Sequence, residues 1–130
     1  MRVHHIGYLV HDIKDSVRQF ESLGYQEISE CTHDEERKIQ ICFMQNEGTV
    51  IELVQPDFDC TIIGKQLKRL RNSPYHICYE CNNIDKSVKK LEAEGWNMIY
   101  PPMAAPAIEN RKVAFLFGSD VGLIELVESK

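Results

Sequence analysis

Hydrophobic and polar positions follow the same order twice along the chain. After His5, alternating apolar residues are followed by apolar residues at helical spacing. The same pattern begins again after His76, 71 positions further along the chain. A second match lies further on, where Ile51-Glu52-Leu53-Val54 recurs as Ile124-Glu125-Leu126-Val127. Two matches in the same order predict a tandem duplication.

Each copy is predicted to contain one helix and four strands in the order β-α-β-β-β. Asp12 and Asn83 are suitable N-caps for the two helices, and Gly24 and Gly95 are expected to end them. After the first strand and the helix, further strands are expected at 25–30, 38–45 and 49–55 in the first copy, and at 96–100, 112–117 and 122–128 in the second. The fold class is therefore α+β, built from tandem βαβββ modules.

The whole chain, 1–130, is expected to be a single domain made of module 1–56, connecting helix 57–73 and module 74–130. The connecting segment has apolar residues at helical spacing, and its other face is basic. That face is either solvated or able to meet an anionic ligand tail; it carries Lys65, Lys68, Arg69 and Arg71. The proline-rich stretch 101–110 has no apolar period and predicts a loop over a pocket.

Composition limits the location and the partners. The 130 residues are 43% hydrophobic and 27% charged, no apolar run approaches the roughly 20 residues that cross a bilayer, and the start has no secretory signal pattern. A cytoplasmic protein is expected. The formal charge of −5 argues against nucleic acid or a membrane as partner. Five cysteines are expected to be reduced, and Cys78 and Cys81, three apart in a predicted strand, to be structural rather than metal-binding.

Two histidines and two glutamates occupy equivalent positions in the copies. His5 and His76 are expected to point away from the helices, because the apolar residues of the first strands pack beneath the helices: Ile6, Tyr8, Ile77 and Tyr79. Glu52 and Glu125 follow the same rule in the later strands. His4 is excluded, because its parity matches the apolar face. A single such residue is more often structural, but two His/Glu pairs on one face favour a divalent transition metal.

These residues give the sequence its resemblance to a known family. From His5-Ile-Gly to Leu123-Ile-Glu125-Leu, nearly the whole chain resembles the vicinal oxygen chelate superfamily, which includes glyoxalase I (lactoylglutathione lyase) and methylmalonyl-CoA epimerase. The resemblance implies a curved mixed sheet around a metal cleft. It also implies one divalent ion per site, nickel, cobalt or zinc, held by His5, Glu52, His76 and Glu125.

The resemblance further implies a metal-dependent lyase or isomerase. Such an enzyme abstracts a proton next to a carbonyl through a metal-bound enediolate or enolate. Glu125 is the first candidate for the acid/base, Glu52 its counterpart, and Glu36 a weaker candidate for a separate base. The expected substrate is a small molecule such as a thioester or hemithioacetal, and the basic face with Arg111 is the candidate for contact with its anionic carrier. The expected assembly is a homodimer. The alternatives are a non-catalytic protein that sequesters a drug or metabolite and, less favoured, an extradiol dioxygenase.

Overall fold

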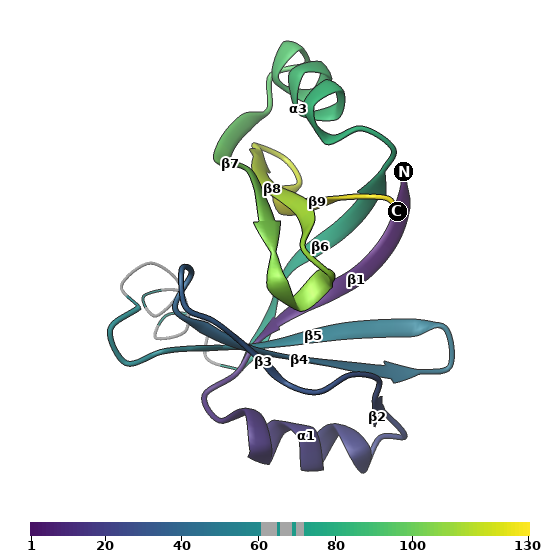
Figure 1. Cartoon of the computed structure of the whole chain (residues 1–130), viewed down its shortest axis with the longest axis vertical. Coiled ribbons are helices and arrows are strands. Elements are labelled where there is room, and N and C mark those ends of the chain that lie inside the picture. Colours follow the sequence, from purple (N-terminus) through teal and green to yellow (C-terminus); the bar gives the residue numbers. More distant parts are fainter. Residues whose placement is uncertain (61–64, 66–68, 70–71) are drawn as a thin grey trace. The chain divides into compact units, whose positions relative to one another are not determined.

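The chain forms two compact units, and strand β1 (Arg2–Leu9) contributes to both. The computed structural model describes residues 1–60, 65, 69 and 72–130. One unit contains Met1–His5 with His76–Lys130, and the other contains Ile6–Tyr75. Each holds a mixed sheet and one longer helix (Figure 1), so the predicted α+β class is confirmed. The expected module boundaries at 56 and 74 stay predictions.

The unit Ile6–Tyr75 contains the first copy of the repeat. Its β5 pairs in parallel with β1 and antiparallel with β4, and the short strands β2 and β3 pair with β4. The strands predicted at 38–45 and 49–55 are confirmed to within a residue or so, whereas 25–30 contains only the two residues of β2. The elements are α1 (Ile13–Glu21), β2 (Gln26–Glu27), β3 (Thr32–Asp34), β4 (Ile39–Asn46) and β5 (Thr49–Pro56).

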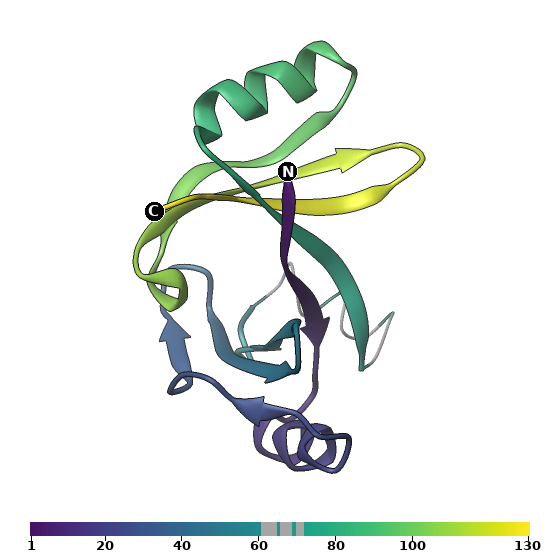
Figure 2. The same ribbon diagram turned by 90° about the vertical axis from the view of Figure 1, so that its right-hand side faces the viewer.

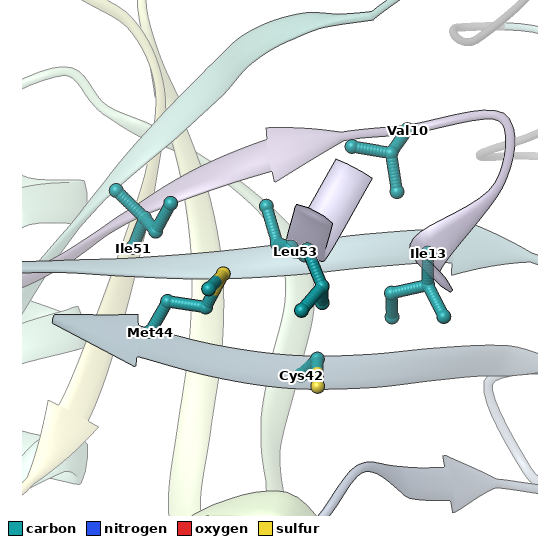
Figure 3. Close-up of a cluster of buried hydrophobic side chains, with 7 residues drawn as sticks. Val10, Ile13, Cys42, Met44, Ile51 and Leu53 are labelled. Atoms are coloured by element: carbon teal, nitrogen blue, oxygen red, sulfur yellow. The ribbon is translucent and has the colours of Figure 1, made fainter. Parts of the chain in front are cut away.

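Helix α1 packs its apolar face against β4 and β5, and Figure 3 shows Ile13, Met44 and Leu53 of this cluster. Ile13 and Val17 are the buried residues of the helix, as its spacing predicted. They pack with Met44 and Leu53, neither of which is exposed to solvent. Burial of such side chains contributes about 1.5–3 kcal/mol each before entropy is counted, so this contact fixes the helix on the sheet.

The other unit repeats this architecture. Its β6 pairs in parallel with β9, and β8 lies between β9 and β7, antiparallel to both. Figure 2 shows α3 lying over β7–β9, where it buries Ile84 and Val88 against Leu116 and Leu126. The elements are β6 (Ser73–Cys81), α3 (Ile84–Ala93), β7 (Asn97–Ala105), β8 (Arg111–Gly118) and β9 (Gly122–Glu128).

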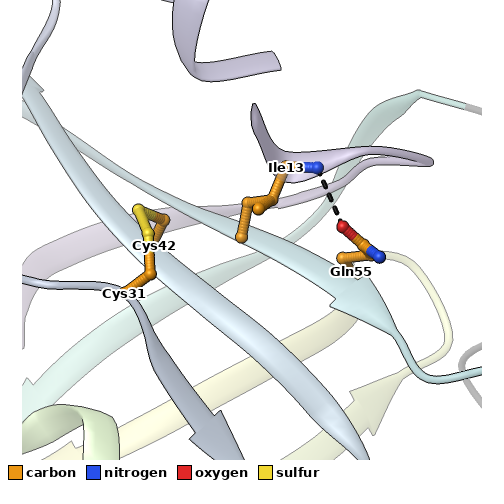
Figure 4. Close-up of a disulfide and its surroundings, with 4 residues drawn as sticks. All are labelled: Ile13, Cys31, Cys42 and Gln55. Atoms are coloured by element: carbon orange, nitrogen blue, oxygen red, sulfur yellow. Dashed lines mark hydrogen bonds between the residues drawn. A yellow bond between two sulfur atoms is a disulfide. The ribbon is translucent and has the colours of Figure 1, made fainter. Parts of the chain in front are cut away.

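The two copies also share the contacts that start and end their helices. The side chains of Asp12 and Asn83 accept hydrogen bonds of 2.9 Å from the amides three residues on, and Gly24 and Gly95 have φ values of +98° and +96°. These predictions are confirmed, because a positive φ suits glycine after a helix. A further contact recurs: the Ile13 amide donates to Gln55 (2.8 Å, Figure 4), and the Ile84 amide to Glu128 (3.1 Å).

The prediction of a loop at 101–110 is wrong for the first half of that segment. Strand β7 continues to Ala105, and a 3-10 turn follows at Pro106–Ile108. Among the described strands of this unit β7 is at an edge, where proline costs no ladder hydrogen bond, and the register shifts between Tyr100 and Met103. Ile77 was also expected to pack beneath the helix, but it is 40% exposed.

The expectation that all five cysteines are reduced is wrong. Cys31 and Cys42 form a disulfide, with their Cα atoms 4.4 Å apart (Figure 4). The register that pairs Thr32 with Ile41 continues into this cross-strand position. Cys60, Cys78 and Cys81 are not part of a disulfide, and the last two lie buried in β6, as the strand interpretation of their spacing predicted.

Most of the expected connecting helix lies outside the described residues. Positions 61–64, 66–68 and 70–71 are not described, so Lys68 and Arg71 of the basic face fall outside, whereas Lys65 and Arg69 are helical and exposed. Among the described residues no helix has the length and apolar character needed to span a membrane.

Candidate metal centre

Three of the four predicted ligands converge in the unit that contains both chain ends. His5 of β1, His76 of β6 and Glu125 of β9 are 1%, 4% and 3% exposed. Glu125 Oε2 lies 3.0 Å from His5 Nε2 and 3.1 Å from His76 Nε2, and the two Nε2 atoms are 3.3 Å apart. Three donor atoms from three strands therefore meet at one buried point.

Strand register explains why these side chains meet. Cys78 of β6 is paired with Glu125 of β9, and His76 lies two residues before Cys78, on the same face of β6. On the other side of β9, Phe115 of β8 is paired with Glu125, and its ring stands edge-on to His76 with 5.3 Å between centroids. The Phe115 ring beside the donors limits their contact with water.

Burial and the two imidazoles act in opposite directions on Glu125. Burial raises the pKa of a carboxyl group, but hydrogen bonds with His5 and His76 outweigh it, and the pKa of Glu125 lies far below its usual value. The group is therefore a carboxylate at neutral pH. A buried carboxylate oxygen beside two imidazole nitrogens is a ligand set that a divalent cation would complete.

The spacing of the donors fits a metal ion. Ligand atoms about 2.1 Å from one ion lie about 3.0 Å apart at octahedral angles and about 3.4 Å apart at tetrahedral angles. The observed separations, 3.0, 3.1 and 3.3 Å, fall in that interval. Imidazole nitrogen with carboxylate oxygen suits a divalent transition metal.

His4, which the parity argument excluded, contacts the site from behind. Its Nδ1 lies 2.8 Å from Nδ1 of His5, and its Nε2 lies 3.4 Å from Nη1 of Arg111. Burial lowers the pKa of His4, and the neighbouring His5 and Arg111 lower it further. Parity missed this contact because Nδ1 is close to the backbone and reaches sideways to the adjacent residue.

Arg111 does not have the role suggested from the sequence. Its side chain is only 11% exposed and donates to Glu80 (2.8 Å) and to the carbonyl of Glu128 (2.6 Å). Glu80 also accepts from Arg2, at 2.9 Å. A guanidinium held in this way supports the interior of the unit and is not available to hold an anionic carrier.

The other two predicted site residues belong to the unit Ile6–Tyr75. Glu52 lies in β5, is 5% exposed, and is paired with Gly7 of β1 and Phe43 of β4. Glu36 lies in the exposed turn between β3 and β4. The structure thus buries Glu52, as expected of a ligand, and leaves Glu36 open to solvent.

Comparisons with known proteins agree with this fold. A Bacillus subtilis (strain 168) protein, "Uncharacterized protein YqjC", is 28% identical over 99% of this chain and 93% of its own length. The mitochondrial methylmalonyl-CoA epimerase of Dictyostelium discoideum is 28% identical over 98% of this chain and 78% of its own length. A variant of Streptomyces coelicolor methylmalonyl-CoA epimerase in complex with 2-nitronate-propionyl-CoA has a TM-score of 0.85 at 21% identity, covering 99% of this chain and 97% of its own, a likeness of fold. A family model matches residues 4–115, and the chain belongs to the Glyoxalase/Bleomycin resistance protein/Dioxygenase superfamily.

Proposed function

We propose that this chain is a metal-dependent lyase or isomerase of the glyoxalase I and methylmalonyl-CoA epimerase type, which removes a proton next to a carbonyl and returns it. The observation that carries the proposal is the buried convergence of two imidazole nitrogens and one carboxylate oxygen, all within 3.3 Å of one another. The similarity to epimerases over nearly the whole chain supports the same reaction class.

His5, His76 and Glu125 would hold a divalent ion, and Glu52 is the proposed fourth ligand. The repeat supports Glu52, which is the equivalent of Glu125 in the other copy and is likewise buried. The bound cation would stabilise the negative charge that develops on the carbonyl oxygen of the substrate when the neighbouring carbon loses its proton.

Glu125 is the proposed acid/base. Its carboxylate is ionised at neutral pH, which is the form that accepts a proton. Phe115 packs beside it and limits the access of bulk water. Glu52 is its proposed counterpart, and Glu36, in its exposed turn, is the weaker candidate for a separate base.

The proposed substrate is a thioester or a hemithioacetal. One structural neighbour, a methylmalonyl-CoA epimerase variant, is in complex with an acyl-CoA compound. With Arg111 occupied, the exposed basic residues Lys65 and Arg69 are the described candidates from that face for contact with an anionic carrier.

The test measures proton exchange directly. Protein loaded with zinc, cobalt or nickel is incubated in deuterium oxide with methylmalonyl-CoA and, separately, with the hemithioacetal of methylglyoxal and glutathione. We expect conversion of one substrate with uptake of solvent deuterium, and loss of both in Glu125→Gln at saturating metal. Glu92→Gln, an exposed position of α3, is the matched control and should keep full activity.

Two outcomes would contradict the proposal in different ways. Full activity in Glu125→Gln would remove that residue as the acid/base. A wild-type protein that binds no metal and converts neither substrate would overturn the enzyme assignment and favour sequestration of a ligand.

A further inference from the structure

Two adjacent histidines of β1 meet through the same ring atom. Nδ1 of His4 and Nδ1 of His5 are 2.8 Å apart, a hydrogen-bond distance between two nitrogens. Such a bond needs a proton on one of the two atoms and a lone pair on the other. The tautomer of one ring therefore fixes the tautomer of the other.

We propose that His4 is a positioning residue for His5, whose ring it holds in the form that binds metal. This inference rests on the proposed metal site. For Nε2 of a neutral His5 to offer its lone pair to an ion, the ring proton must be on Nδ1, and that proton needs an acceptor. The acceptor is Nδ1 of His4, which then carries its own proton on Nε2, so that Nε2 of His4 no longer accepts from Nη1 of Arg111.

The opposite arrangement suits the site without a metal. Nη1 of Arg111, 3.4 Å away, then donates to Nε2 of His4, whose Nδ1 donates to His5, and Nε2 of His5 donates to Oε2 of Glu125 at 3.0 Å. Between the two arrangements each ring loses the proton on one nitrogen and gains one on the other. Each ring has one proton before and after, so the change needs no added acid or base.

The surroundings of His4 argue against a role as a ligand. The donors of His4, His5 and Cys78 lie within 4.8 Å of one another, which allows a second cluster in principle. However, the guanidinium of Arg111 stands beside His4 and stays charged, and it would repel a cation there. Arg111 is itself fixed by Glu80. A hydrogen-bonded support for His5 is the role that these charges permit.

The experiment compares zinc affinity in variants of the full chain. His4→Phe removes the acceptor and keeps a ring, His4→Gln restores an acceptor oxygen, and His11→Phe, at an exposed position, controls for loss of a histidine. We expect the Kd for Zn²⁺ to rise about 10–100-fold in His4→Phe. His4→Gln should regain most of the lost zinc affinity, and His11→Phe should have the Kd of the wild type.

A second measurement uses the wild-type protein and does not depend on the folding of a variant. Nitrogen-15 NMR of the zinc-loaded chain should find the His5 proton on Nδ1, with a coupling through the hydrogen bond to Nδ1 of His4. The role of His4 would be overturned if the zinc-loaded wild type carried no proton on Nδ1 of His5. It would also be overturned if His4→Phe bound zinc with the Kd of the wild type. A wild type that binds no zinc would contradict the proposed function itself.

Discussion

The Cys31–Cys42 disulfide is expected to stabilise the chain by a measurable amount. The bond joins two positions 11 apart in sequence, one exposed in the segment before β3 and the other fully buried in β4. Reduction breaks the covalent link. It leaves the pairing of β3 with β4 and the packing of the Cys42 side chain in place, so the native contacts change little.

The magnitude follows from the loop that the bond closes. In the chain-entropy account, a cross-link around about 12 residues lowers the entropy of the unfolded chain by about 9.5 cal/mol/K, or about 2.8 kcal/mol of stability at 25 °C. With an m value of about 2 kcal/mol/M in urea, loss of the bond should lower the unfolding midpoint by about 1.4 M.

The assay is urea unfolding followed by far-ultraviolet circular dichroism, with and without a reductant. Oxidised wild type should unfold at the higher midpoint, and reduced wild type should coincide with Cys31→Ser. The reductant should not move the midpoint of Cys31→Ser, which controls for effects on Cys60, Cys78 and Cys81. Equal midpoints for the oxidised and reduced wild type would refute the reasoning.

Other predictions concern the metal, the core, the charges and the assembly. His76→Ala should lower zinc affinity by orders of magnitude in a competition titration, because it removes one of the buried donors. Leu126→Ala should lower the free energy of unfolding by about 2–5 kcal/mol in urea, since Leu126 is fully buried. Arg111 lowers the pKa of Glu80, so the stabilisation is present above the ordinary pKa of 4.5 and lost as the pH falls; the urea midpoints of wild type and Glu80→Gln should differ at pH 7 and converge in acid. Sedimentation equilibrium should give twice the 15.0 kDa chain mass, because the edge strand β7 and the end of β8 expose apolar side chains that a partner would cover: Met98, Ile99, Tyr100 and Phe117. A monomer would contradict this prediction.

The sequence predicted what depends on local pattern. Helical spacing, N-caps and terminal glycines lie within a few residues of one another, so α1 and α3 could be located from the chain alone. The convergence of His5, His76 and Glu125 was also predictable, because the repeat identifies equivalent positions and strand parity assigns their face.

What depends on register or on distant partners could not be predicted. The Cys31–Cys42 bond requires the pairing of β3 with β4, and β3 is too short for its sequence pattern to predict that pairing. The Arg111 side chain is held by a hydrogen bond to Glu80, which lies 31 residues away in sequence. Strand β7 runs through two prolines because it lies at an edge, and edge position is a property of the sheet rather than of the segment.

The duplication separates what the two copies must share from what they can change. His5 and His76 are retained, and so are Glu52 and Glu125, but the strand partner of Glu52 is Gly7 while that of Glu125 is the equivalent residue Cys78. The backbone arrangement and the phenylalanine partner of each glutamate, Phe43 or Phe115, are repeated, whereas Cys78 adds a side chain where the first copy has a glycine. Glu125 lies between Cys78 and Phe115, and a carboxylate confined in this way keeps its position relative to a bound substrate. This asymmetry is the physical reason to expect proton transfer at Glu125 before Glu52.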